Sequence, residues 1–163
     1  MKKKILAITA GLLTAMALTA CGKDPKLTQF KGEIDAFCTE ISDIDTAINN
    51  VDAESDTATD ELLGYLDPSF QNFAELDFPT EFDYLESLAD EASAYMTQAV
   101  ESYHEAYSNG GYNQLTADYA KENYARAYKR IQIIITFLHG EQPENVNLTT
   151  AEETADAAST TAE

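Results

Sequence analysis

Cysteine and histidine are scarce in this chain of 163 residues, which contains two of each. The two cysteines, Cys21 and Cys38, allow at most one disulfide. The histidines, His104 and His139, are expected at exposed helix positions, where they are poor material for general base chemistry. Motifs for a nucleophile elbow, a phosphate-binding loop, haem attachment or paired cysteines are also missing. These absences predict a protein that is not an enzyme and holds no cofactor.

Basic residues are also few, with ten Lys and Arg against 29 Asp and Glu. The segment from Gly32 to Ala120 contains 21 acidic residues and not one Lys or Arg. A polyanion finds no basic footprint on such a segment, so nucleic acid is excluded as a partner. A strongly acidic body also disfavours anionic lipid and anionic wall polymers, which leaves neutral or cationic partners.

The N-terminus has the three parts of an export signal. Three lysines at positions 2 to 4 precede an apolar run over residues 5–17, and small residues follow. The run is shorter than the ~20 apolar residues that span a bilayer, which disfavours an uncleaved transmembrane helix. The ending Leu18-Thr19-Ala20-Cys21 resembles the lipobox of bacterial lipoprotein precursors. This resemblance implies cleavage before Cys21 and a diacylglycerol group on its sulfur. With that lipid on Cys21, Cys38 has no partner and no structural disulfide can form. The alternative is a secretory signal cut after Ala20 without lipidation.

The lipobox resemblance implies a location for the mature protein. Two acyl chains are enough for stable anchoring, where one chain is marginal. Residues 1–20 are therefore expected to be a lipoprotein signal peptide and residues 21–24 a lipid-anchored tether, with the mature protein on the extracytoplasmic face of the cell membrane. Lys23, Lys26 and Lys31 near the anchor either contact anionic headgroups or are solvated tether residues.

Three long segments have apolar residues in alternating steps of three and four, the pattern of helices with one buried face. The first helix is expected from Pro25 to about Asn50, with Asp24 as its N-cap. The second is expected after Pro79 with Thr80 as its cap, and the third from about Asn113 to Gly140. Because alanines line the faces of the last two, we expect these helices to form a closely packed antiparallel hairpin.

The stretch from Thr59 to Leu76 holds six large apolar residues with Pro68 in its middle. Asp67-Pro68 is typical of a cap and a first helical residue, so the stretch predicts two short helices or one helix kinked at Pro68. Counted as one element, it gives an all-α antiparallel bundle of four elements over residues 25–140. If it is only a connector, the fold is a three-helix bundle. Residues 141–163 are predicted to be a disordered acidic tail.

One loop partly matches a calcium-binding pattern. Asp52, Glu54, Asp56 and Asp60 occupy positions one, three, five and nine of a calcium loop, but the EF-hand glycine at position six and glutamate at position twelve are missing. The loop is therefore either a weak site for calcium or another cation, or a solvated acidic loop.

A second pattern is the Glu-x-x-His unit formed by Glu101 and His104, which di-iron bundles use twice. Here it occurs once, and helical periodicity directs both side chains away from the apolar face. We expect these residues to face water and to bind no metal.

Tyrosines and basic residues of the last two helices are the remaining candidates. Seven of the nine tyrosines lie between Tyr84 and Tyr124, mostly at the edges of apolar faces, which favours buried rings with wet hydroxyls over a sugar-binding surface. Tyr112, in the glycine-rich turn, is the exception. A basic cluster on the last helix is expected to form internal ion pairs; its members are Lys121, Arg126, Lys129 and Arg130.

In style, the acidic helical body is similar to the small acidic helical lipoproteins common in Gram-positive anaerobes, a resemblance that implies no particular activity. The sequence predicts a non-catalytic, membrane-anchored lipoprotein that acts as a binding module for another envelope component. The alternative is a weak calcium or other cation-binding module that uses the loop 52–60. Two substitutions test which side of the first helix is buried. Ile41→Asp should unfold the domain, and Asp45→Lys should leave its stability nearly unchanged.

Overall fold

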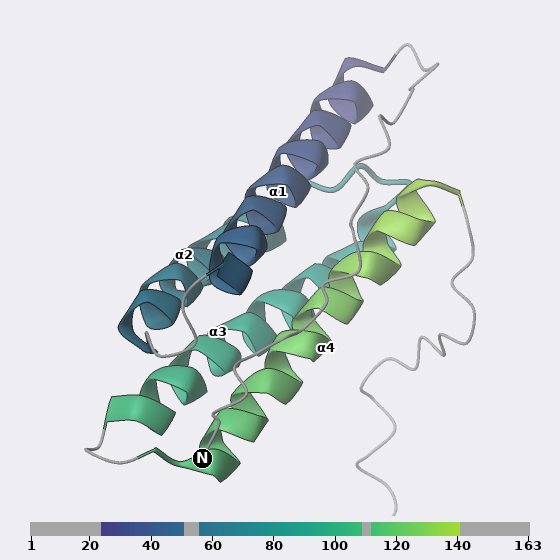
Figure 1. Cartoon of the computed structure of the whole chain (residues 1–163). Coiled ribbons are helices and arrows are strands. Elements are labelled where there is room, and N and C mark those ends of the chain that lie inside the picture. The colour runs from purple at the N-terminus through teal and green to yellow at the C-terminus, as the bar shows by residue number, and fades with distance from the viewer. Residues whose placement is uncertain (1–23, 51–55, 109–111, 141–163) are drawn as a thin grey trace, which may run out of the picture.

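Four α-helices joined by short connections form the described part of the chain, and in a computed structural model this part comprises residues 24–50, 56–108 and 112–140. The helices are α1 (Pro25–Asn50), α2 (Asp56–Ala74), α3 (Glu86–Ser108) and α4 (Gln114–Leu138), and a turn of 3-10 helix, η1 (Asp83–Leu85), directly precedes α3. Each helix packs on the next one along the chain, and they run alternately up and down (Figure 1). The fold is an all-α antiparallel four-helix bundle, so the three-helix alternative is wrong.

The two ends of the bundle are formed by different parts of the chain (Figure 1). The proximal end holds the start of α1, the connection between α2 and η1, and the end of α4. The distal end holds the end of α1, the start of α2, the end of α3 and the start of α4. If Cys21 is lipidated, the proximal end faces the membrane, because residue 24 lies there.

Helix α1 begins and runs as its sequence predicts. The side chain of Asp24 accepts a hydrogen bond from the backbone N–H of Lys26 at 2.9 Å, so it caps the helix, and Pro25 takes the first helical position. The apolar face is confirmed at five buried positions, which are Phe30, Ile34, Phe37, Ile41 and Ile48.

Helix α2 decides between the two arrangements predicted around Pro68 in favour of a single helix. It is one helix of 19 residues that passes through Pro68, so Asp67 does not begin a new helix. The Asp67 carboxylate instead accepts hydrogen bonds from Thr97 Oγ1 of α3 at 2.6 Å and from Gln71 Nε2 at 3.0 Å. Its polar contacts therefore join α2 to α3.

Helix α3 begins later than predicted, and Thr80 is not its cap. Residues 80–82 form a turn in which the Phe82 N–H donates to the Pro79 carbonyl at 2.6 Å, and η1 follows before α3 starts at Glu86. The 3-10 turn tightens the entry into the helix, as is common at helix N-termini.

Helix α4 has both predicted boundaries. The Asn113 side chain caps it by accepting from the N–H groups of Leu115 and Thr116 at 3.1 and 3.3 Å. At the other end Gly140 has a φ of 76°, which a glycine adopts without steric cost. The contact between α3 and α4 is the most extensive in the bundle, and its buried alanines allow the close approach predicted from the sequence.

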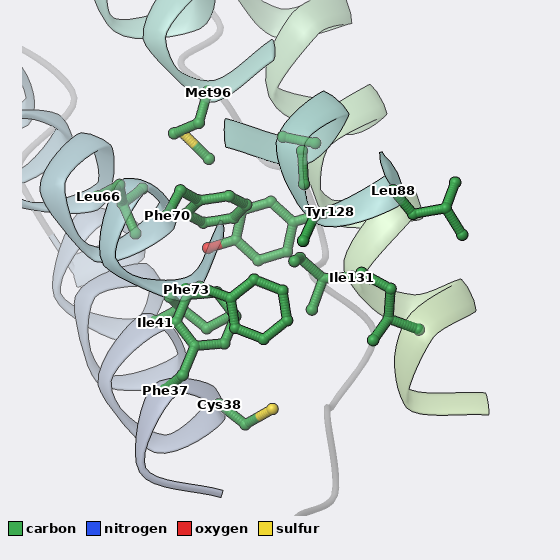
Figure 2. Close-up of a cluster of buried hydrophobic side chains, with 14 of the residues drawn as sticks. Phe37, Cys38, Ile41, Leu66, Phe70, Phe73, Leu88, Met96, Tyr128 and Ile131 are labelled. Atoms are coloured by element: carbon green, nitrogen blue, oxygen red, sulfur yellow. The ribbon is translucent and has the colours of Figure 1, made fainter. Parts of the chain in front are cut away.

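The core is aromatic where α1, α2 and α4 meet (Figure 2). The Phe37 ring stacks on Phe73 with centroids 4.2 Å apart and meets Phe70 edge-on at 5.4 Å. Phe70 in turn lies 5.6 Å from the Tyr128 ring of α4. These large rings fill the space between α1, α2 and α4, whereas small alanine side chains line the contact between α3 and α4. The thiol of Cys38 is buried at the edge of this cluster, in the apolar role expected for it.

Several sequence predictions lie outside the described residues. They are the signal peptide of residues 1–20, the tether with Cys21, and the tail of residues 141–163. Among the helices that the structure does describe, none combines the length and the apolar character needed to cross a membrane.

Candidate functional site

The acidic loop is described only at its end. Asp52 and Glu54 lie outside the described residues, and Asp56 is the first residue of α2. Asp60, in the next turn, directs its carboxylate to α3, where Oδ2 lies 3.1 Å from His104 Nδ1. Within the described ranges, no group of three or more His, Cys, Asp or Glu side chains is placed to hold a metal ion.

Glu101 and His104 are both exposed, as helical periodicity predicts. The His104 side chain is 66% exposed, and it contacts the Asp60 carboxylate across the α2–α3 interface. His139 takes the C-cap position of α4, where its backbone N–H donates to the carbonyl of Ile135. The contact of His104 is thus a pair with one carboxylate, and it belongs to no group of three metal-ligating side chains within the described ranges.

On the solvent side of α3 and α4, arginines of α4 contact an aromatic ring of α3. The guanidinium groups of Arg126 and Arg130 lie over the Tyr95 ring at 5.6 and 5.2 Å from its centroid. Arg130 Nε also donates to Glu91 Oε2 at 2.8 Å. Cation–π contacts of this kind contribute about 0.5–1 kcal/mol at exposed sites, and together they hold the Tyr95 ring between two arginines.

Contacts between α3 and α4 on the same side continue toward the distal end of the bundle. The Tyr119 hydroxyl of α4 donates to Gln98 Oε1 of α3 at 3.1 Å, while 47% of Tyr119 remains exposed. One turn earlier, Leu115 is 81% exposed. We refer to this surface as the α3–α4 face, and its members are Tyr95, Gln98, Leu115, Tyr119, Arg126 and Arg130.

The basic cluster forms internal ion pairs at three of its four positions, as expected. Arg126 Nη2 lies 2.5 Å from Glu122 Oε1, and Lys121 Nζ lies 3.9 Å from Asp118 Oδ1. The third is the Arg130–Glu91 pair described above. All three pairs are partly exposed, so each contributes at most about 1 kcal/mol. Lys129 is exposed on the same helix and forms no ion pair among the described residues.

The tyrosines divide into buried and exposed sets. Tyr103, Tyr124 and Tyr128 are buried in the core. Tyr112, the predicted exception, is 39% exposed at the distal end, and its ring lies 5.2 Å from that of Tyr107. The exposed rings do not gather into one flat platform that would stack on a sugar, since Tyr65, Tyr84 and Tyr112 lie on different parts of the bundle.

A buried carboxylate between α1 and α4 was not foreseen from the sequence. Asp45 is 6% exposed and accepts a hydrogen bond from the Tyr124 hydroxyl. Burial raises the pKa of the Asp45 carboxyl, and the hydroxyl groups of Tyr124 and Tyr128 oppose that rise. Asp45 was expected on the solvent side, so the prediction that Asp45→Lys is silent is withdrawn. The signal was present, because Asp45 follows Ile41 by four residues and precedes Ile48 by three.

Comparison of this chain with protein-family models, with curated proteins and with solved structures gives no match. The function must therefore be argued from the surfaces of the bundle itself.

Proposed function

We propose that the protein is a non-catalytic lipoprotein, anchored through Cys21 on the extracytoplasmic face of the membrane, that binds another envelope protein through its α3–α4 face. The proposal is supported by the lipobox at Leu18-Thr19-Ala20-Cys21 and by the character of that face. The anchor supplies the location and the face supplies the contact surface.

The observation that carries the proposal is the coincidence of exposed apolar side chains and arginines at one place on an acidic bundle. Leu115 and Tyr119 are two of the five large hydrophobic side chains that are exposed among the described residues, and they lie one helical turn apart. Arg126 and Arg130 continue the same side of α4, and both contact Tyr95. Tyrosine and arginine are the side chains enriched at the energetic centres of protein interfaces.

The chemistry of the partner follows from the rim of this face. Glu91 and Glu122 each bond an arginine of the face, and other exposed acidic residues lie on the same two helices; they include Glu105 and Asp118. A partner surface with an apolar centre and a basic rim complements this arrangement, whereas an acidic one is repelled. We therefore propose a protein partner whose contact surface is neutral to basic.

In-cell photocrosslinking tests the face. A photoreactive amino acid at Leu115 should give one discrete protein adduct, whereas the same group at Asn72, exposed on α2, should give none. Arg126→Ala should weaken the adduct because it removes a cation from Tyr95, while Lys129→Ala removes an equal charge from α4 without that contact and should leave the adduct intact. Adducts that contain only lipid, or equal yields from Leu115 and Asn72, would contradict the proposal.

A separate measurement tests the anchor. The mature native protein should have the mass of residues 21–163 plus a diacylglycerol group, and Cys21→Ser should release it into the medium. A bare Cys21 sulfur in the native protein would remove the membrane location and leave the α3–α4 face to be tested in solution.

A further inference from the structure

A cleft of about 390 Å³ opens at the proximal end of the bundle, away from the α3–α4 face. One wall is formed by the first turns of α1 and the other by residues 77–81, which connect α2 to the turn before η1. Its volume falls within the range of about 300–1,000 Å³ that is usual for small-molecule sites.

The floor of the cleft is aromatic. Phe30 and Phe78 both line it, and their rings meet edge-on with centroids 4.9 Å apart. Phe30 is only 2% exposed and Phe78 only 5%, so each ring is held in place by the core beneath it. Leu27 and Pro79 are partly exposed and form the accessible apolar lining above these buried rings. A ligand with a small alkyl or aromatic part would place that part against Leu27 and Pro79.

The walls of the cleft carry an excess of negative charge. Four carboxylates line it against a single ammonium group, that of Lys26; they belong to Asp24, Glu33, Asp77 and Glu81. Gln29 Nε2 donates to Glu33 Oε1 at 2.9 Å, which orients that carboxylate and leaves its other oxygen as an acceptor. The arrangement favours a cationic ligand.

An anion is the opposite possibility, because the cleft includes the N-terminus of α1. The positive end of a helix attracts anions through its unpaired N–H groups. In this helix Asp24 already supplies the anion, since its own carboxylate accepts the Lys26 N–H. A second anion would therefore meet an occupied helix end and three further carboxylates.

We propose that this cleft binds a small organic cation, an amine with an alkyl or aromatic part. The ammonium group would lie among the carboxylates of Glu33, Asp77 and Glu81, and the apolar part would contact Leu27 and Pro79 above the buried rings of Phe30 and Phe78. The site is independent of the proposed partner-binding face, because it lies on α1 and the α2–η1 connection.

Calorimetric titration of the full chain in detergent, with empty micelles as the blank, tests this proposal. The probes are phenethylamine, its neutral analogue 2-phenylethanol, and inorganic phosphate. We expect saturable binding of phenethylamine that weakens at high salt, as an interaction with partly exposed carboxylates does. Phenylethanol should bind about tenfold more weakly or not at all, since it lacks the charge, and phosphate should not bind.

Paired variants locate the site. Asp77→Asn combined with Glu81→Gln removes two exposed carboxylates of the cleft and should weaken phenethylamine by about fivefold or more. Glu101→Gln combined with Glu105→Gln removes two exposed carboxylates of α3 outside the cleft and should leave the affinity unchanged. Four outcomes overturn the proposal: no saturable binding of phenethylamine, equal binding of phenylethanol, tighter binding of phosphate, or equal losses in the two double variants.

Discussion

Replacement of Asp45 by Asn should stabilise the protein at neutral pH and leave its stability nearly unchanged in acid. Asp45 is 6% exposed between α1 and α4, where its carboxylate accepts a hydrogen bond from the Tyr124 hydroxyl. Burial raises the pKa of this carboxyl above its ordinary value of 3.8, and the Tyr124 and Tyr128 hydroxyl groups oppose the rise. Over a range of pH above 3.8, the folded chain therefore holds a proton on Asp45 that the unfolded chain has lost.

The sign of the pH effect follows from this difference in proton binding. Because the pKa is higher in the folded state, the stability that the neutral carboxyl contributes is complete below the unfolded-state pKa. It is lost as the pH rises through the folded-state pKa. Asn keeps an acceptor oxygen for Tyr124 and cannot ionise. The advantage of the variant should thus grow with pH and then level off. A buried polar group whose hydrogen bonds are incomplete lowers the free energy of unfolding by about 1–3 kcal/mol. For a domain of this size, that loss corresponds to about 4–12 °C in Tm.

Urea unfolding followed by far-UV circular dichroism, at several pH values from about 3 to 8, measures this difference. Asp43→Asn is the matched control, because it removes the same charge from an exposed position of α1. That control corrects for the general relief of repulsion in an acidic protein. The reasoning is refuted if Asp45→Asn and Asp43→Asn follow the same pH profile, or if Asp45→Asn destabilises the protein equally at every pH.

Four further outcomes follow from positions on α1 and at the start of α4. Ile41 is fully buried, so Ile41→Asp should lower the free energy of unfolding by at least about 3 kcal/mol in urea titrations. Asp45→Lys should also lower the free energy of unfolding, because Asp45 is buried. An unchanged stability of Asp45→Lys would contradict that burial. Asn113→Ala should cost about 1 kcal/mol by loss of the α4 cap, against no change for exposed Asn72→Ala in the same titration. Burial, with a smaller contribution from the charge of Asp35, raises the pKa of the Cys38 thiol to about 11. Iodoacetamide should therefore label Cys38 slowly in the folded protein at pH 8 and rapidly in urea. Rapid labelling of the folded protein would contradict this reasoning.

The helices could be predicted because their boundaries depend on local chemistry. Asp24-Pro25 and Asn113 are short-range caps, and Gly140 ends α4 in a conformation that suits glycine. Of the two arrangements that the sequence allowed at Pro68, the single helix has a long-range reason. Asp67 and Pro68 have the local character of a helix start, but Asp67 bonds Thr97 of α3, and the helix continues through them.

The α3–α4 face and the proximal cleft were harder to predict, because they depend on contacts between separate parts of the chain. The ion pairs of Arg126 with Glu122 and of Lys121 with Asp118 lie within one helix, and helical spacing predicts such neighbours. The pairing of Arg130 with Glu91, and the position of both arginines over Tyr95, require the relative placement of α3 and α4. The proximal cleft likewise joins residues about fifty positions apart, from α1 and from the α2–η1 connection.

The α3–α4 face is a consequence of the alanine interface below it. Alanines such as Ala92 and Ala99 of α3 and Ala120 and Ala127 of α4 are buried at 0–3% exposure, so the two helices approach closely along their length. Long side chains have no room in such an interface and must lie across its solvent edge, where they contact the opposite helix. This accounts for the Tyr119–Gln98 hydrogen bond and for the arginines over Tyr95. The face is therefore already ordered before any partner binds, which lowers the entropy cost of association. Ala99→Leu should separate the helices and loosen these contacts, so it should weaken the Leu115 crosslink although Ala99 itself is buried.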